Sequence, residues 1–198
     1  MAKVKLTKNE QKKQKDALKM YTRYLPTLIL KKQQLQMEIR KVEERAAQVK
    51  AKKEALEEEF RSWIGVFGEE VGLDSSLLKV KEIVTSKGNI AGVPIPVFER
   101  AEFYPVSYDI FEKPLWVDKA VAKLEQLMLF DLEYEVLEQQ VALLEQELRT
   151  TSQRVNLFEK VMIPETKANI KKIGVYLGDQ QTAAVVRGKI SKRKLKVS

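Results

Sequence analysis

The chain has 198 residues, of which 44% are hydrophobic, so it can bury a substantial core and wholesale disorder is excluded. It contains no cysteine and no histidine, which excludes disulfides, thiolate metal sites and cysteine nucleophiles and removes the commonest general base. Only eight glycines and six prolines interrupt it, and this composition favours long helices.

Positive charge is concentrated at the two ends of the chain. In total 36 Lys and Arg oppose 28 Asp and Glu, which gives a net charge of +8. Residues 1–19 contribute +5 and residues 187–198 contribute +6, so the body between them is mildly acidic. Such ends suit nucleic acid, an anionic membrane surface or an acidic cavity of another protein. Because no secretory leader and no apolar run of about 20 residues is present, we expect a soluble, cytoplasmic protein without direct membrane insertion.

The first long segment, residues 1–64, carries the heptad pattern of a coiled-coil helix. Apolar residues recur at alternating steps of three and four, and polar residues fill the positions between them. Heptads sustained over this length predict a left-handed coiled coil. Pro26 lacks a backbone donor, so we expect a kink or a helix restart near residues 23–26. The predicted seam includes Leu28, Leu35, Ile39 and Val42, with lysine at two of its positions, Lys32 and Lys53.

The middle of the chain, residues 65–113, differs in composition. It holds five of the eight glycines and is dense in aromatic and β-branched residues. Alternating patterns predict two strands over residues 79–85 and 93–103, joined by a loop over 86–92. Two prolines at the start of the second strand restrict it to a sheet edge. A hairpin of this size is not stable alone, so we expect it to pack against the helices.

A second heptad segment, residues 114–178, predicts the C-terminal coiled-coil helix. After Met162 the pattern slips by one residue and resumes at Ile163, beside Pro164, which offers a physical cause for altered helix geometry. Two glycines weaken the predicted helix end, so residues 179–198 follow as a basic C-terminal tail. The seam of this helix includes Val141, Leu144, Leu148, Val155 and Phe158.

The two helices fit an antiparallel pair within one chain. The predicted fold is therefore mainly α: a long antiparallel two-helix left-handed coiled coil with a small β-hairpin module between its helices. If residue 64 lies near residue 115, the numbers of facing residues sum to about 179. Each seam lysine then either finds an acidic partner across the seam or turns outward to solvent. This register predicts four facing sets: Leu35 with Leu144, Tyr24 with Val155, Lys32 with Glu147, and Lys53 with Glu125 or Gln126.

No pattern of catalytic or metal-binding residues is found. The glycines at 65, 68 and 72 are not followed by Lys-Ser or Lys-Thr, so no phosphate-binding loop exists. The acidic runs 57–59 and 69–70 have spacings at which carboxylates on a helix do not converge on one ion. We therefore predict a protein that is not an enzyme, with no catalytic residue, metal site, cofactor or small-molecule ligand.

Aromatic residues gather around the predicted hairpin and allow two interpretations. They either form the small core of this module or provide a docking face for another protein. The residues concerned are Phe98, Phe103, Tyr104, Tyr108, Phe111 and Trp116.

The C-terminal helix resembles a known family. The run Arg154-Val-Asn-Leu-Phe-Glu-Lys-Val-Met-Ile-Pro164, followed by Ile170-Lys-Lys-Ile173, is similar to the C-terminal helix of the D subunit of the V-type (archaeal and bacterial A/V-type) rotary ATPases. The ending that starts Arg187-Gly-Lys-Ile and the middle run Gly-Asn-Ile-Ala-Gly-Val-Pro-Ile-Pro also resemble this family. The first helix resembles it more loosely, and Pro26 departs from the family's pattern.

The resemblance implies a central-stalk rotor subunit that transmits rotation between the ATP-hydrolysing ring of A and B subunits and the membrane ion-translocating ring. The implied partners are the A and B subunits, the F subunit and the socket subunit above the membrane ring, so the protein would lie in the cytoplasm, peripheral to the membrane. The expected contacts with the A/B ring are Arg187, Lys189, Lys192, Arg193 and Lys194. The expected contacts with the F subunit are Val84, Ile90, Val93, Ile95, Val97 and Phe98.

Two other functions are compatible with a coiled coil that has basic ends. One is a structural or scaffolding protein, and the other is a nucleic-acid-binding protein. We expect no nucleic acid partner, because no nucleic-acid-binding fold accompanies the basic ends and aromatic residues are not interleaved with the basic ones.

Overall fold

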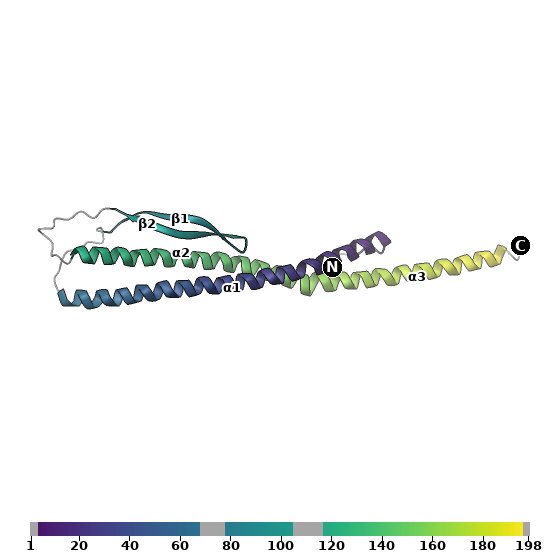
Figure 1. Ribbon diagram of the computed structural model, residues 1–198. Coiled ribbons are helices and arrows are strands. Elements are labelled where there is room, and N and C mark those ends of the chain that lie inside the picture. Colours follow the sequence, from purple (N-terminus) through teal and green to yellow (C-terminus); the bar gives the residue numbers. More distant parts are fainter. Residues whose placement is uncertain (1–3, 68–77, 105–116, 196–198) are drawn as a thin grey trace. The chain divides into compact units, whose positions relative to one another are not determined.

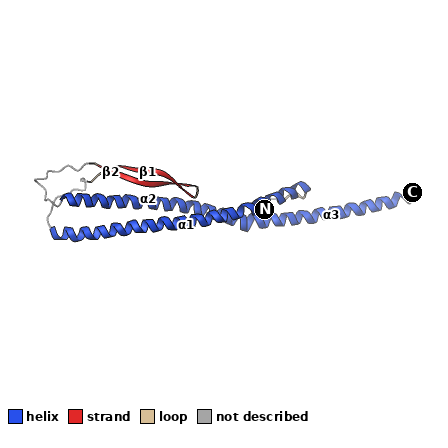
Figure 2. Ribbon diagram, in the orientation of Figure 1, coloured by secondary structure: helices blue, strands red, loops and turns tan. Residues whose placement is uncertain are grey.

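A computed structural model describes residues 4–67, 78–104 and 117–195, without the side chains of residues 62–67 (Figure 1). The described fold is mainly α with one two-stranded antiparallel sheet, as predicted (Figure 2). Its elements are α1 (Lys8–Phe67), β1 (Val80–Ile90), β2 (Val93–Phe103), α2 (Val117–Asn156), the π-helix η1 (Leu157–Met162) and α3 (Ile163–Leu195).

The chain divides into two compact units, which are described separately. The terminal unit comprises residues 1–32 and 150–198, and the central unit comprises residues 33–149. The long helix α1 contributes its first turns to the terminal unit and its remainder to the central unit.

Helix α1 begins at a capping sequence. The backbone N–H of Glu10 donates to Thr7 Oγ1 at 3.2 Å, so the threonine satisfies one of the donors that the first turn leaves unpaired. The helix then runs through Pro26 without interruption, so of the two alternatives the restart is wrong and the kink stays a prediction. Nearby, the Thr27 hydroxyl donates to the Tyr24 carbonyl at 2.7 Å, within the turn that the proline disturbs.

The core of the central unit is the predicted seam together with the hairpin. Leu35 and Leu144 are both fully buried in one cluster, which confirms their predicted proximity and the antiparallel pairing. Val93 and Ile95 of β2 belong to the same cluster, so the hairpin packs on the helices as predicted. The other buried members are Ile39, Val42, Ala46, Val49 and Leu137, with Val141 and Leu148 packed against them.

The hairpin is longer than predicted and its turn is shorter. Strand β1 continues to Ile90, so the predicted loop over residues 86–92 is reduced to Ala91 and Gly92. Both turn residues have positive φ, 52° and 83°, as a two-residue type I′ connection requires. The N–H of Gly92 donates to Asn89 Oδ1 at 2.9 Å. The sequence pattern missed this because Ser86 to Asn89 have low strand propensity, which ladder pairing overrides.

A hydrogen bond and a close backbone approach fix the hairpin in place. Gln140 is buried, and its side-chain amide donates to the Pro96 carbonyl at 2.6 Å. Opposite β2, a Cβ atom at Gly88 would come within 2.7 Å of Val97 Cγ2. Glycine therefore lets the two strands and their apolar side chains pack closely at this point.

Within the terminal unit the helices follow the predicted antiparallel register. The rings of Tyr21 and Phe158 lie 5.1 Å apart, and these two residue numbers sum to 179. Phe158 is therefore a seam residue, as predicted. Val155 is buried whereas Tyr24 is 54% exposed, and the facing of these two residues stays a prediction. The fully or largely buried seam positions of this unit are Thr151, Val155, Thr166 and Ile173.

The predicted one-residue slip of the heptad pattern is a π-helical turn. Between Leu157 and Met162 the chain adopts a π-helix, in which each N–H donates to the carbonyl five residues back instead of four. At its end the N–H of Ile163 donates to the Phe158 carbonyl, five residues back. Pro164 follows immediately and has no N–H to donate, which favours this rearrangement. The extra residue restores the seam, so that Thr166 and Ile173 are buried.

Helix α3 does not end at the predicted position. It continues through Gly174 and Gly178 to Leu195, so most of the predicted tail is helical. Each glycine costs a helix only about 1 kcal/mol relative to alanine, so the two glycines weaken the helix without ending it.

Some predictions fall on residues outside the described part of the chain. These are the boundary between the middle module and the second helix at 113–114, the acidic pair at 69–70, and the aromatic residues Tyr108, Phe111 and Trp116.

Candidate partner-binding surfaces

The end of α3 is a helix without a packed partner among the described residues. From Gly178 to Leu195 every side chain except that of Ala183 is exposed. The five cations predicted to contact the A/B ring all lie on this exposed part of α3. The same part carries the apolar residues Val185, Val186 and Ile190, each of which is about half exposed. A helix with both apolar and basic side chains free is suited to being enclosed by another protein.

Some of these basic residues also stabilise helix α3 itself. Lys192, Arg193 and Lys194 occupy the last turn of α3. Positive charge at a helix C-terminus is favourable because the unpaired carbonyl groups give that end a partial negative charge. These three cations therefore have a structural role whatever they bind.

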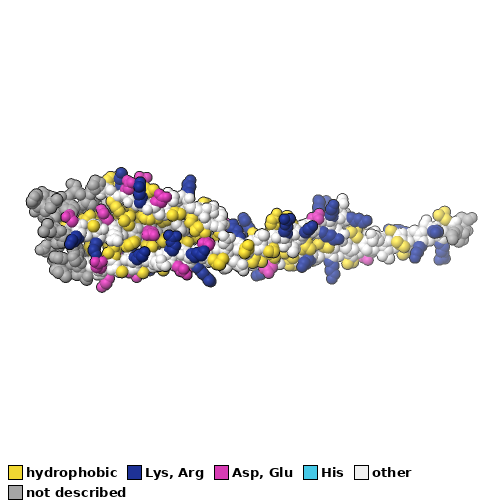
Figure 3. Space-filling model, in the orientation of Figure 1, with side chains coloured by type: hydrophobic (Ala, Val, Ile, Leu, Met, Phe, Trp, Pro, Cys, Tyr) yellow, Lys and Arg dark blue, Asp and Glu magenta, His cyan; other side chains and the backbone are white. Residues whose placement is uncertain are grey.

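The two units have opposite charge. The terminal unit contains 21 Lys and Arg and 5 Asp and Glu, a net charge of +16. The central unit contains 15 Lys and Arg and 23 Asp and Glu, a net charge of −8. Figure 3 shows the basic side chains along the helices of the terminal unit. The sequence alone showed only that the two ends of the chain are basic. The lysines of residues 150–172 become part of the same basic unit only when the helices pair.

The hairpin residues predicted to contact the F subunit point mainly toward the helices. Val93 and Ile95 are buried in the core, and Ile90 and Val97 pack against it. Phe98 lines a hollow of about 230 Å³ between the hairpin and helix residues such as Arg45 and Glu133. The structure thus gives these side chains a packing role, and their contact with a partner stays a prediction.

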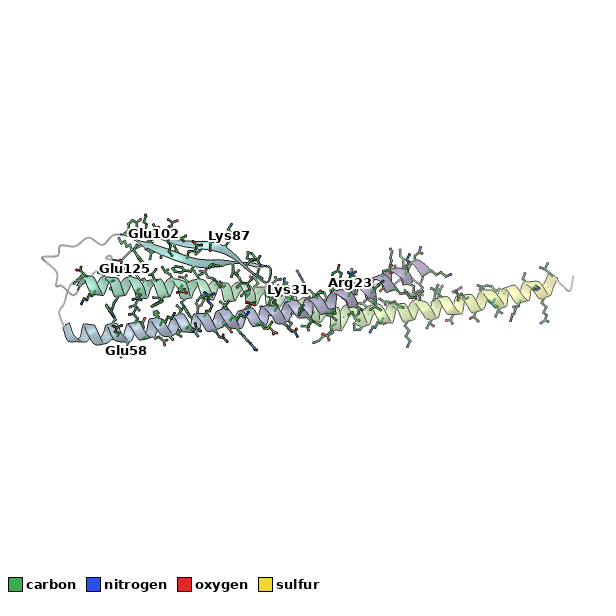
Figure 4. The ribbon with its side chains drawn as sticks, in the orientation of Figure 1. Arg23, Lys31, Glu58, Lys87, Glu102 and Glu125 are labelled. Atoms are coloured by element: carbon green, nitrogen blue, oxygen red, sulfur yellow. The ribbon has the colours of Figure 1, made fainter. Side chains whose placement is uncertain are left out.

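The opposite face of the hairpin carries charged side chains. Figure 4 shows Lys87 and Glu102 on the side of the hairpin that faces away from α2. Glu102 Oε1 lies 3.3 Å from Arg100 Nη2, and Glu102 Oε2 lies 3.5 Å from Lys81 Nζ. This face is therefore polar, with ion pairs that are too exposed to add much stability.

The seam lysine Lys53 has an acidic partner, but not one of the two predicted. Its Nζ lies 2.6 Å from Asp131 Oδ1 and 3.5 Å from Glu57 Oε1. The hydrogen bond to Asp131 is the main reason why the pKa of Lys53 is raised. Lys123 also pairs with Glu59, and in both ion pairs the residue numbers sum to slightly more than 179, as long side chains that lean toward the N-terminus of each helix allow. Lys32 and Glu147 lie in different units, and their pairing stays a prediction.

A groove, separate from the hollow beside Phe98, lies between α1 and α2 in the central unit. It has a volume of about 410 Å³ and a floor that includes Ala46, Ala47 and Ala142. Three carboxylates line it, those of Glu43, Glu138 and Glu145, together with Tyr134 and Val141. The Tyr134 hydroxyl donates to Glu138, and this hydrogen bond raises the pKa of the tyrosine. Sequence analysis missed the groove, although alanines next to a seam of larger residues are a signal for it.

Neither a membrane span nor a metal site is found among the described residues. No described helix is long and apolar enough to cross a membrane. Within the described ranges, no group of three or more Asp and Glu side chains is arranged to hold a metal ion.

Comparison with known proteins decides the family. Residues 10–193 match the family model described as the D subunit of ATP synthase. The chain belongs to this family. It is 53% identical over 195 residues to the V-type ATP synthase D subunit of Borreliella burgdorferi, covering 98% of this chain and 96% of that protein. It is 34% identical over 194 residues to the V-type ATP synthase D subunit of Chlamydia muridarum, covering 97% and 96%. The family resemblance that is most specific in the C-terminal helix is thus confirmed, and it extends over nearly the whole chain.

Proposed function

We propose that this chain is the rotor shaft in the central stalk of a V-type ATP synthase. In this role it transmits rotation between the ATP-hydrolysing A/B ring and the membrane ion-translocating ring, and it carries out no chemistry itself. The observation that supports this most is the terminal unit, where two antiparallel helices share a buried seam and carry a net charge of +16.

The helices have the length and packing that torque transmission needs. Helix α1 has 60 residues, which corresponds to about 90 Å at 1.5 Å per residue. A single helix of this length bends easily, whereas two helices with an interlocked seam resist bending and twisting together. The close-packed side chains of such a seam transmit strain because interiors have low compressibility.

The basic end of α3 is proposed to lie inside the A/B ring. Its five cations would face acidic or polar loops of the ring while the shaft turns. A single deep electrostatic well would stall rotation, because leaving it costs as much free energy as entering it releases. Exposed, flexible cations with pair energies of about 0.2–1 kcal/mol each suit a surface that slides.

Two further subunits are proposed to bind this chain. The F subunit would bind beside the hairpin, and the socket subunit would connect the shaft to the membrane ring. The protein would then lie on the cytoplasmic side, peripheral to the membrane. Scaffolding and nucleic acid binding are not favoured, because the family match covers residues 10–193.

Replacing the five cations of α3 with serine tests the contact with the ring. We expect the dissociation constant for an isolated A/B ring to rise by about tenfold, with a smaller salt dependence, since several weak ion pairs are lost. ATP turnover of complexes that have assembled should change only modestly. Binding is measured by titration at two salt concentrations, and turnover by phosphate release.

A variant that exchanges Lys and Arg at the same five positions is the control, since it keeps the charge and should bind normally. Unchanged binding by the serine variant would refute the ring contact. Loss of all turnover in fully assembled serine complexes would instead indicate specific torque contacts at these residues.

A further inference from the structure

The hollow beside Phe98 is built by the hairpin and both helices of the central unit. Figure 1 shows the hairpin lying along α2, and the lining of the hollow comes from β1, β2 and α2 together with Arg45 of α1. Its volume is about 230 Å³. An apolar space with a few polar groups directed to it is typical of a small-ligand site. The apolar side chains of its lining are Ile90, Ile95, Val97, Phe98, Val136 and Leu137.

Gln140 brings an unused hydrogen-bond acceptor to this hollow. The residue lines the hollow and is only 5% exposed. Its Nε2 donates to the Pro96 carbonyl at 2.6 Å, and because a carbonyl oxygen can only accept, this bond fixes which end of the amide is nitrogen. Among the described residues none donates to the other end, Oε1. A buried acceptor without a donor is costly, so an occupant that donates to Oε1 gains affinity.

The two charged residues of the lining have opposite signs. Arg45 is exposed and Glu133 is half-buried, and both line the hollow. Because their charges cancel, the lining selects neither an anion nor a cation. The hollow therefore favours an occupant without net charge.

The volume and the apolar lining favour an organic molecule over water alone. A cavity of about 150 Å³ lined by Leu, Ile and Phe side chains can hold benzene, so about 230 Å³ has room for one or two rings. Water molecules could satisfy Gln140 Oε1, but they would also have to contact the apolar side chains that form most of the lining. An aromatic ring covers these side chains and removes their surface from water.

We propose that this hollow binds a neutral aromatic molecule of one or two rings that carries an N–H or O–H donor, as indole and phenol do. The ring would pack against the apolar lining, and the donor would reach Gln140 Oε1. The sequence alone predicted no small-molecule ligand, because position 45 and the segments 88–98 and 133–140 come together only in the fold. This inference does not depend on the proposed function.

Two ligands of the same shape test the proposal on the unaltered chain. Indole has an N–H donor, whereas indene is a hydrocarbon of nearly the same size, without a donor and more hydrophobic. Each is titrated into the full chain, and binding is followed by NMR of the methyl groups of Ile95 and Val97. We expect saturable shifts with indole and a dissociation constant about fivefold lower than with indene, because only indole satisfies the buried acceptor. Absence of saturable shifts, or tighter binding of indene, would overturn the proposal.

Substitution of the acceptor supplies the matched variant. In Gln140→Leu we expect the dissociation constant of indole to rise about fivefold while that of indene does not rise, so the preference for indole disappears. Gln139→Leu makes the same change at an exposed neighbouring position outside the lining and should keep the preference. A Gln140→Leu chain that folds, as judged by circular dichroism, and still prefers indole would overturn the role of Oε1. If it does not fold, the comparison of the two ligands on the unaltered chain remains decisive.

The donor-bearing ring can come from a free molecule or from a Trp or Tyr side chain of another subunit. Repeating the indole titration on the assembled complex distinguishes these sources. A free ligand leaves the hollow open to indole in both the isolated chain and the complex, whereas a side chain that fills the hollow abolishes indole binding in the complex alone. Either result supports the site and assigns its occupant, and failure of indole to bind the isolated chain would refute both.

Discussion

Leu144→Ala is expected to lower the free energy of unfolding by about 2–5 kcal/mol. Leu144 is fully buried and packs in one cluster with Leu35, Ile39 and the hairpin residues Val93 and Ile95. Removing its side chain therefore leaves a cavity where the two helices and the hairpin meet, and a close-packed core relaxes into such a cavity only in part. Urea denaturation followed by circular dichroism measures the change.

The adjacent residue supplies a matched control. Leu143 is 38% exposed and lies on the same helix, so Leu143→Ala removes the same atoms at nearly the same helix position. Its expected cost is below about 1 kcal/mol, since surface substitutions rarely cost more. Equal costs for the two variants would mean that Leu144 is not part of a packed seam.

Deletion of Val161 is expected to be tolerated, although it removes a residue from the middle of a long helical segment. Val161 lies in the π-helix and is 47% exposed. The π-helix holds one residue more than the heptad pattern requires, so its deletion leaves a continuous heptad seam from Val155 to Ile173. The stability of the terminal unit should change by less than about 1 kcal/mol, as measured by urea denaturation.

Deletion of a single residue from the central unit should lower stability far more. Gln139 is exposed on α2 in the central unit, where the seam has no extra residue. Deleting it turns the following seam residues by about 100° away from α1 and the hairpin, so several buried side chains lose their contacts. We expect a loss of about 3 kcal/mol or more. If deletion of Val161 were as damaging as deletion of Gln139, the π-helix would not be the cause of the slip in the heptad pattern.

Sequence periodicity predicted most of the fold because the seam is repetitive. A single apolar position such as Leu35 carries little information, but a dozen at heptad spacing define a helix face and its antiparallel partner. The same regularity made the slip after Met162 visible before its geometry was known. Helix ends were predicted less well, since Gly178 signals an end locally while α3 continues to Leu195.

The partner-binding surfaces were predicted less well because they depend on which face each residue occupies. Val93 and Ile95 were expected to contact the F subunit, yet they are buried against the helices. The groove with Glu43 on α1 and Glu138 on α2 joins residues almost a hundred positions apart. Its acidic character appears only when the helix register is fixed.

Rotation of the chain inside an immobilised A/B ring is the most direct test of the proposed function. The chain has no native cysteine, so Lys87→Cys creates a unique attachment point for a bead on the exposed face of the hairpin. With the A/B ring fixed to a surface, addition of ATP should make the bead turn continuously in one direction, and without ATP it should stay still. A bead that remains fixed while the same complexes hydrolyse ATP would contradict the rotor-shaft function.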